Sequence, residues 1–577
     1  VILSPFSTRA IYELGMESIP SESECYPAKL AHGHAQWLID HGIKTIFHPC
    51  VFYEHQEVSG AQNHFNCPIV ISYPENIKNN VEAVTDGSVR YLHPFLAFTN
   101  EKVASDRLVQ FCKEVWNIPE KETRHAAHLA WEEQRRAKAD VRAAGAKALA
   151  DMEKNGGSGI VLAGRPYHVD PEINHGIPEL IAAYGLTVLT EDCLPIDFVP
   201  KRPVRVNDQW VYHSRLYTAA EFVCGRDDLE LIQLNSFGCG LDAVTTDEVC
   251  ELLEQGGKLY TCLKIDEVNN LGAVRIRIRS LLAAVAMRRE RGIHSTSHVQ
   301  PFERVYYTKE MQKQHYTILA PQMSPIHFDL LEPIFRHHGY NFEVLQNDDR
   351  TAIDAGLKYV NNDACYPSIT AVGQLMEAVT SGRYDTDHLA LIMSQTGGCC
   401  RASNYIAFIR RALKKAGLEH IPVISLNANG METNEGFRIS PSLLLDAAHG
   451  VVLGDLLMRC LYRVRPYELE KGSANALHRK WRDICIDSLT SEHPKYRYAQ
   501  LCRGIVEDFD AFPIDETIRK PRVGVVGEIL VKYMPLANNH VVDLLEREGA
   551  EAVVPDLLDF FAATIYEQDF KHTHLGK

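Results

Sequence analysis

Residues 1–27 read VILSPFSTRAIYELGMESIPSESECYP, and residues 344–367 read VLQNDDRTAIDAGLKYVNNDACYP. Each stretch predicts an apolar strand, then a helix that carries a glycine, and then the tripeptide Cys-Tyr-Pro. Cys25 and Cys365 therefore occupy equivalent places in two copies of one passage. A repeat at this distance predicts a duplicated domain rather than a small solenoid unit.

The repeat continues downstream of both cysteines. IKTIFHPCVFYE (43–54) matches LALIMSQTGGCCRASNY (389–405), and each reads as a strand, a turn and then cysteine. This match pairs Cys50 with Cys400 or with Cys399. CPIVIS (67–72) matches IPVIS (421–425), which predicts a Pro-led strand in both copies, but Cys67 stands opposite an isoleucine.

A third match joins residues 159–189 to residues 522–554, and both read strand–loop–helix–strand with Gly164 opposite Gly527. Cys239 follows Gly164 by 75 residues, whereas the same distance from Gly527 runs past the last residue of the sequence. The helix expected before the second copy's first strand also has no counterpart before Val1. We therefore expect the chain to be a piece of a longer protein, cut at both ends.

Short Val/Ile/Leu-rich runs alternate with helical stretches along the chain. This alternation indicates parallel sheets that are buried on both faces. We expect an α/β fold of duplicated pairs of open parallel-sheet units, Rossmann-like or flavodoxin-like, with bridging helices over 121–155 and 473–510. The expected domains are an N-terminal α/β unit with its bridging helix (1–155), a second α/β unit (156–300), the second copy's N-terminal unit with its helices (301–520) and its truncated second unit (521–577).

Composition limits the class of protein. The chain has 577 residues, a hydrophobic fraction of 45% and a net charge of −15, without a basic stripe. This charge argues against nucleic acid as a partner. The apolar runs are too short for a membrane span, and no secretory signal is visible. Fifteen cysteines scattered through the chain are not typical of a disulfide framework, so we expect a cytoplasmic protein.

The placement of the cysteines predicts a site. Ligands of open α/β sheets gather at the carboxyl ends of the strands, where Cys25, Cys50 and Cys239 are expected to converge. Cys67 begins its predicted strand and is expected nearer the opposite edge. Three converging thiols without a repeated histidine suit an iron–sulfur cluster better than structural zinc. Buried thiols without a ligand remain the alternative.

Six strings carry a resemblance to a known family. They are SESECYPAKLAHGH, NCPIVISYPE, LAGRPYHVDPEINHGIPEL, NSFGCGLDAV, NNDACYPSITAVGQLMEA and SQTGGCCRASNYIAFIRRAL. In these strings the chain closely resembles the activase-related branch of the 2-hydroxyacyl-CoA dehydratase/benzoyl-CoA reductase superfamily. That superfamily also contains the double-cubane cluster proteins. The resemblance covers nearly the whole chain.

The resemblance implies an iron–sulfur cluster, of [4Fe–4S] or double-cubane type, in an oxygen-sensitive cytoplasmic protein. The implied cluster and metal ligands are Cys25, Cys50 and Cys239 in the first copy and Cys365 and Cys400 in the second, with Cys399 as an alternative to Cys400. It further implies ATP-driven electron transfer to an acyl-CoA or other small substrate, in a dehydratase (a lyase) or a reductase. A non-catalytic electron-transfer or regulatory module is the alternative.

The implied partner is an actin-like ATPase activator within the same full-length polypeptide. The phosphate-binding motifs of that ATPase are missing from this sequence, so we expect no ATP hydrolysis by the chain itself. Arg165, in the Gly-Arg-Pro-Tyr-His stretch 164–168, follows a strand and precedes a helix. There it could hold an anion such as a CoA phosphate, or it could pair with a nearby acid.

Overall fold

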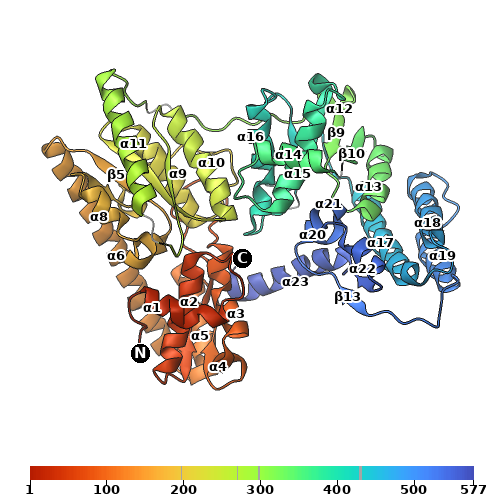
Figure 1. Cartoon of the computed structure of the whole chain (residues 1–577), viewed down its shortest axis with the longest axis horizontal. Coiled ribbons are helices and arrows are strands. Elements are labelled where there is room, and N and C mark those ends of the chain that lie inside the picture. The colour runs from red at the N-terminus through yellow and green to blue at the C-terminus, as the bar shows by residue number, and fades with distance from the viewer. Residues whose placement is uncertain (196–197, 269–270, 297–298, 348, 428–431, 577) are drawn as a thin grey trace. The chain divides into compact units, whose positions relative to one another are not determined.

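The computed structural model describes residues 1–195, 198–268, 271–296, 299–347, 349–427 and 432–576 (Figure 1). The chain forms two compact units. The first comprises Val1–Glu303, with Gly398–Arg401 and the segment from Phe570 onward, and the second comprises Arg304–Gly397 and Ala402–Asp569. Both units contain parallel strands and many helices, so the predicted α/β class is confirmed.

The first unit begins with a helical layer over two short pairs of parallel strands. β1 pairs with β3, and β2 pairs with β4, in two separate two-stranded sheets. The elements are α1 (Arg9–Gly15), α2 (Tyr26–Asp40), β1 (Thr45–Phe47), β2 (Cys50–Tyr53), α3 (Pro68–Asn80), α4 (Glu82–Thr85), β3 (Arg90–Leu92), β4 (Phe95–Ala97), α5 (Glu101–Trp116) and α6 (Glu120–Lys154).

A four-stranded parallel sheet follows in the same unit, with strand order β6-β5-β7-β8. Its central strand β7 is buried at every residue, as expected for a strand that is covered on both faces. The elements are β5 (Gly159–Ala163), α7 (Pro171–Asn174), α8 (Ile177–Ala182), β6 (Thr187–Leu189), α9 (Val211–Cys224), β7 (Leu229–Ser236), α10 (Gly240–Gln255), β8 (Thr261–Ile265) and α11 (Leu271–Glu290).

One hydrophobic core connects these two parts of the first unit. Ile11 and Tyr26 of the N-terminal helices pack in the same cluster as Ile160 and Ile232 of the sheet and Ile278 of α11. Burying such side chains stabilises the fold by about 1.5–3 kcal/mol each. The helix that begins after Cys25 is therefore fixed against the sheet whose strand β7 leads to Cys239.

The second unit repeats the four-stranded arrangement, with strand order β10-β9-β11-β12 and all pairs parallel. Its elements to this point are α12 (Lys309–Lys313), β9 (Thr317–Ala320), α13 (Pro325–His337), β10 (Phe342–Val344), α14 (Arg350–Tyr359), α15 (Tyr366–Thr380), β11 (Leu389–Ser394), α16 (Tyr405–Lys415) and β12 (Val423–Leu426).

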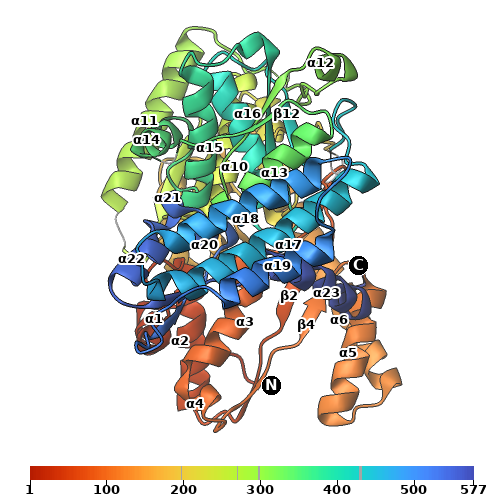
Figure 2. The same cartoon turned by 90° about the vertical axis from the view of Figure 1, so that its right-hand side faces the viewer.

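Three long helices and a small sheet complete the second unit. α17 (Pro441–Val464), α18 (Ser473–Thr490) and α19 (Tyr498–Asp510) lie side by side (Figure 2) around a core that includes Trp481. β13 (Arg522–Gly524) and β14 (Glu551–Val553) form a parallel pair. The remaining helices are α20 (Ile529–Tyr533), α21 (Pro535–Asn538), α22 (Val541–Arg547) and α23 (Leu557–Leu575), of which α23 belongs to the second unit only up to Asp569.

A close contact between two helices at a glycine recurs in both units, in each case at the helix that follows a candidate cysteine. α1 and α2 approach so closely that a β-carbon on Gly33 would lie 1.9 Å from the carbonyl oxygen of Ile11. α14 and α15 do the same, since a β-carbon on Gly373 would lie 1.9 Å from the carbonyl oxygen of Ala352. Only glycine permits such an approach of two backbones.

Two expectations about local structure are wrong. Residues 1–8 form no strand. The stretch 67–72 is not a strand, because Pro68–Asn80 forms helix α3, whereas its proposed counterpart is strand β12. Cys50 follows strand β1 (Thr45–Phe47) as predicted, and it also begins a further short strand, β2. Both bridging segments are helical as expected: the segment 121–155 corresponds to the single helix α6, and the segment 473–510 contains the two helices α18 and α19. No helix among the described residues has the length and apolarity that crossing a membrane requires.

Candidate functional site: cysteines at helix N-termini

Four of the candidate cysteines occupy the same local position, the residue before the first turn of a helix. Cys25 precedes α2, Cys67 precedes α3 and Cys239 precedes α10 in the first unit. Cys365 precedes α15 in the second unit. Free N–H groups at a helix start favour negative charge, so each position suits a thiolate ligand.

The backbone contacts of these thiols agree with that position. The N–H of Asp242 donates to Sγ of Cys239 over 3.4 Å. Burial raises the pKa of Cys67, and backbone N–H groups of Val70 and Ile69 oppose the rise. The thiols are therefore half-buried and face polar hydrogens that would stabilise a bound, charged form.

Cys25, Cys67 and Cys239 lie close enough to act on one another electrostatically. Burial raises the pKa of Cys25 to about 11, and the Cys67 thiol adds to the rise. Burial also raises the pKa of Cys239 well above its usual value, with further contributions from Asp242 and Cys67. Cys67 therefore lies near the thiols of Cys25 and Cys239. The sequence had predicted it at the opposite edge of a sheet.

Arg165 lies beside these thiols and is buried. Its Nη2 pairs with the carboxylate of Asp242 and lies 2.5 Å from Nε2 of His213. Burial alone would lower the pKa of Arg165, but Asp242, Cys239 and Cys67 outweigh it and raise the pKa. Of the two roles considered for Arg165, an anion site and a partner for a nearby acid, the structure shows the second.

The Arg165–Asp242 pair leaves polar atoms unsatisfied. Nη1 of Arg165, Oδ2 of Asp242 and Nδ1 of His213 are buried and lack a hydrogen-bond partner in the part of the chain that the structure describes. Unpaired buried polar atoms are costly, and an additional charged group beside the thiols would supply interactions for some of them.

A tyrosine accompanies the first cysteine of each copy. The Tyr73 hydroxyl lies 4.0 Å from Sγ of Cys25, and the Tyr405 hydroxyl lies 3.0 Å from Sγ of Cys365. In sequence, Tyr73 follows Cys67 by six residues and Tyr405 follows Cys399 by six residues. The order of elements therefore matches Cys67 with Cys399, or with its neighbour Cys400, and this spacing was the signal in the sequence that could have identified Cys67.

Cys399 and Cys400 lie after β11 and before α16, in the segment Gly398–Arg401. Cys399 is half-buried and Cys400 is exposed. Sequence reasoning left open which of the two is the ligand. The spacing to Tyr405 favours Cys399.

Cys50 lies in different surroundings. It begins β2, is fully buried, and faces Glu75 of α3 and His93 of the link between β3 and β4. Burial raises its pKa to about 12, Glu75 adds to the rise, and Lys78 opposes it. The structure does not bring a second thiol into this group of three residues.

The donor set around Cys25, Cys67 and Cys239 fits an iron–sulfur cluster. Iron–sulfur clusters take thiolate ligands, and hydrogen bonds and nearby charges stabilise them. Three thiols at helix N-termini, the cation of Arg165 and the unsatisfied polar atoms beside it supply these features. Three protein ligands would leave one iron of a [4Fe–4S] group open.

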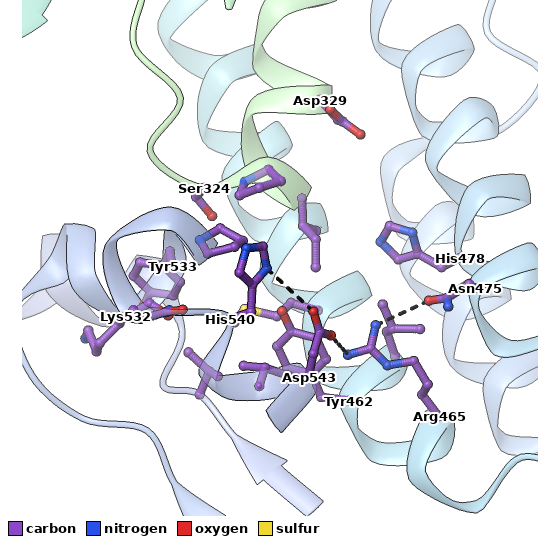
Figure 3. A pocket seen from close by; sticks show the side chains of 18 residues that line it. Ser324, Asp329, Tyr462, Arg465, Asn475, His478, Lys532, Tyr533, His540 and Asp543 are labelled. Atoms are coloured by element: carbon purple, nitrogen blue, oxygen red, sulfur yellow. Dashed lines mark hydrogen bonds and ion pairs between the residues drawn. The ribbon is translucent and has the colours of Figure 1, made fainter. Parts of the chain in front are cut away.

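The second unit contains a cavity of about 290 Å³ (Figure 3). Arg465 points into it, held by Asn475 and by Asp543 at 3.6 Å. His540 lies 3.8 Å from the same carboxylate. Burial lowers the pKa of His478 to about 4, so this histidine is neutral near pH 7. Because the cavity's arginine is already paired with acids, we assign no anionic ligand to it.

Comparison with known proteins identifies one region of the chain. Residues 1–194 match a family model described as CoA enzyme activase uncharacterised domain (DUF2229). The matched region covers about a third of the chain and contains Cys25, Cys50 and Cys67. No curated protein and no solved structure matches the chain.

Proposed function

We propose that the chain is the iron–sulfur module of an ATP-driven, low-potential electron-transfer system that serves CoA-thioester chemistry. The observation that carries the proposal is the grouping of Cys25, Cys67 and Cys239 at three helix N-termini around Arg165. Cys67 takes the place that sequence reasoning gave to Cys50.

The chain's own residues would hold and stabilise the cluster. Cys25, Cys67 and Cys239 would supply the thiolates, and Arg165 would offset part of their negative charge. Tyr73 would direct its hydroxyl toward the Cys25 sulfur. When bound, a cluster of this kind supplies one-electron exchange.

The second copy would provide the matching ligands Cys365 and either Cys399 or Cys400. The Tyr405 hydroxyl lies close to Sγ of Cys365, just as the Tyr73 hydroxyl lies close to Sγ of Cys25. The position of Arg165 is not repeated, because Glu528 follows Gly527 in the corresponding loop. Any cluster in the second copy would therefore lack this cation.

The partner that we propose is an actin-like ATPase activator, and the activase description of residues 1–194 supports it. We propose an acyl-CoA or another small substrate as the final electron acceptor, in the cytoplasm. The same description favours a second candidate, in which the chain relays electrons to a separate enzyme or regulates the activator. Anaerobic mixing of the reduced chain with acyl-CoA, with and without a partner enzyme, separates the two candidates.

The test of ligation is anaerobic reconstitution of the full chain with iron and sulfide, followed by iron and sulfide counts and electron paramagnetic resonance. We expect Cys25→Ser, Cys67→Ser and Cys239→Ser each to remove most of the iron that the first copy binds. Cys50→Ser and the control Cys112→Ser, a half-buried cysteine of α5, should retain it.

Two other outcomes of this experiment would contradict the proposal. If Cys50→Ser loses the iron and Cys67→Ser keeps it, the ligand set expected from the sequence is right and ours is wrong. If the unaltered chain binds no iron or sulfide under these conditions, the iron–sulfur function itself fails.

A further inference from the structure

Three ligand-type side chains of the first unit converge away from the three clustered thiols. Sγ of Cys50, a carboxylate oxygen of Glu75 and a ring nitrogen of His93 all lie within 4.8 Å of one another. They come from β2, from α3 and from the link between β3 and β4. Three separate elements therefore direct one sulfur, one nitrogen and one oxygen to a common point.

The contacts within this group are close, but they do not form a satisfied hydrogen-bond network. Nδ1 of His93 lies 2.7 Å from Oε1 of Glu75. The two atoms are not aligned as a hydrogen bond, and Nδ1 is buried without a hydrogen-bond partner among the described residues. Among the residues that the structure describes, the hydrogen bond of the Cys50 thiol is to the carbonyl oxygen of His93, at 3.8 Å. In its deprotonated form, a group of one thiolate, one neutral imidazole and one carboxylate is a set of ligands that a metal cation binds.

The surroundings restrict how the ligands can move. Cys50 is fully buried, and its N–H donates to the carbonyl oxygen of Pro94 over 2.9 Å, which fixes β2 beside the residue that follows His93. The Tyr91 ring stacks on the His93 ring with centroids 5.9 Å apart. The Tyr91 hydroxyl is engaged by Nδ1 of His48 at 2.8 Å.

We propose that Cys50, Glu75 and His93 form a mononuclear binding site for a divalent cation of the zinc class. Cysteine, histidine and carboxylate are the ligand types that Zn²⁺ takes in proteins, with bonds of about 2.0–2.3 Å in a tetrahedral arrangement. Such bonds place the ligand atoms about 3.5 Å apart, so the 2.7 Å contact between His93 and Glu75 would open slightly, and any ligand atoms that now lie up to 4.8 Å apart would move closer. Three protein ligands leave the fourth position for water.

The exposed side of the site gives the ion access. The side chains of Glu75 and His93 are 34% and 25% exposed, whereas Cys50 is closed off. Lys78 lies 3.7 Å from the other carboxylate oxygen of Glu75, and both side chains reach solvent. The ion would join α3 to β2 and to the β3–β4 link, and it would give Cys50 a role separate from the clustered thiols.

The test is titration of the full chain, freed of metal by a chelator and kept reduced, with Co²⁺ as a spectroscopic substitute for zinc. We expect an intense thiolate-to-cobalt absorption and visible bands typical of four-coordinate Co²⁺. Cys50→Ala should reduce the bound cobalt by one ion per chain. Glu75→Gln and His93→Gln should weaken binding by at least about ten- to a hundredfold, the range found for lost outer partners of metal ligands.

Matched variants decide between this site and the clustered thiols. Cys67→Ser and Cys112→Ser should leave this cobalt ion in place. The site is disproved if Cys50→Ala binds as much cobalt as the unaltered chain, or if Cys67→Ser abolishes the absorption that Cys50→Ala leaves intact. Because Glu75 is partly exposed, Glu75→Gln should fold even if Cys50→Ala does not. An unchanged cobalt affinity in folded Glu75→Gln also disproves the site.

Discussion

Arg165 and Asp242 form the buried ion pair next to the clustered thiols. Both side chains are almost completely removed from solvent, and each keeps one polar atom without a hydrogen-bond partner in the described parts of the chain. In such a pair, loss of one partner leaves the other as an uncompensated charge. Arg165 therefore contributes both to the fold and to the charge balance around the cysteines.

Replacement of Arg165 by glutamine should lower the free energy of unfolding by about 3–5 kcal/mol, because Asp242 would remain buried and unpaired. Urea unfolding of the full chain measures this loss. The control is Arg135→Gln, which removes an exposed 3.8 Å pair with Glu101 and should cost no more than about 1 kcal/mol. Equal, small losses in both variants would contradict the role of the buried pair.

The carboxylate of Glu57 connects the helices α6 and α9 of the first unit. Its carboxylate accepts from Lys138 of α6 at 2.7 Å and from Arg215 of α9 at 2.5 Å. Burial alone would raise the pKa of Glu57, but Arg215 and Lys138 outweigh it and hold the pKa at about 2. The long helix α6 exposes most of its surface, so this ion pair is one of the contacts that fix its position.

The Glu57 pair should make the first unit sensitive to acid. A lowered pKa in the folded state stabilises the fold above the ordinary glutamate value, and this contribution disappears as the pH falls toward the folded-state value. Glu57→Gln should therefore cost about 2–3 kcal/mol at neutral pH. The difference from the unaltered chain should shrink as the pH falls from about 5 toward the folded-state pKa of about 2.

Urea unfolding at a series of pH values measures this difference. Glu22→Gln, at an exposed position, serves as the control and should show little effect at any pH. A cost of Glu57→Gln that stays constant from neutral to acid pH would show that the carboxylate acts through packing and not through its charge.

Much of the strand and helix pattern could be predicted from the sequence, because continuous apolar runs such as those of β5, β7 and β11 have few alternatives in a buried parallel sheet. The stretch after Cys67 could not be assigned in this way. A short apolar run is ambiguous between strand and helix, and here Pro68 occupies the first helical position, where proline is favoured. Ile71, Pro74 and Ile77 then form the buried face of α3 at helical spacing.

This single misassignment also decided the candidate site. Once residues 67–72 are taken as a strand, Cys67 moves away from Cys25, and Cys50 becomes the natural third ligand. The convergence of Cys50 with Glu75 and His93 was equally hidden, because it depends on side chains 25 and 18 residues apart in sequence. Sequence periodicity predicts which residues share one face of a helix or strand. It does not predict which residues of three different elements come into contact.

On the scale of the whole molecule, the two units have separate hydrophobic cores. The core around Ile160 and Ile232 belongs to the first unit, and those around Ile318 and Trp481 belong to the second. A chain with separate cores can unfold in more than one step. We expect two transitions in calorimetry or urea unfolding of the metal-free chain.

The paired glycines allow each transition to be assigned. Gly33→Ala should lower the stability of the first unit only, and Gly373→Ala that of the second unit only, each by about 1–3 kcal/mol or more from overpacking. The controls are Gly225→Ala and Gly524→Ala, because an added β-carbon there meets no atom closer than 3.5 Å. A single transition that both variants shift equally would contradict the division into two units.

The backbone contact at these glycines also has a mechanical consequence. With no side-chain layer between them, α1 and α2 cannot slide or tilt past each other without a collision of main-chain atoms, and the same holds for α14 and α15. Each helix pair should therefore move as one rigid body. If a partner's ATP cycle changes the shape of this protein, Cys25 and Cys365 will travel with their helix pairs, and the hinges must lie outside them.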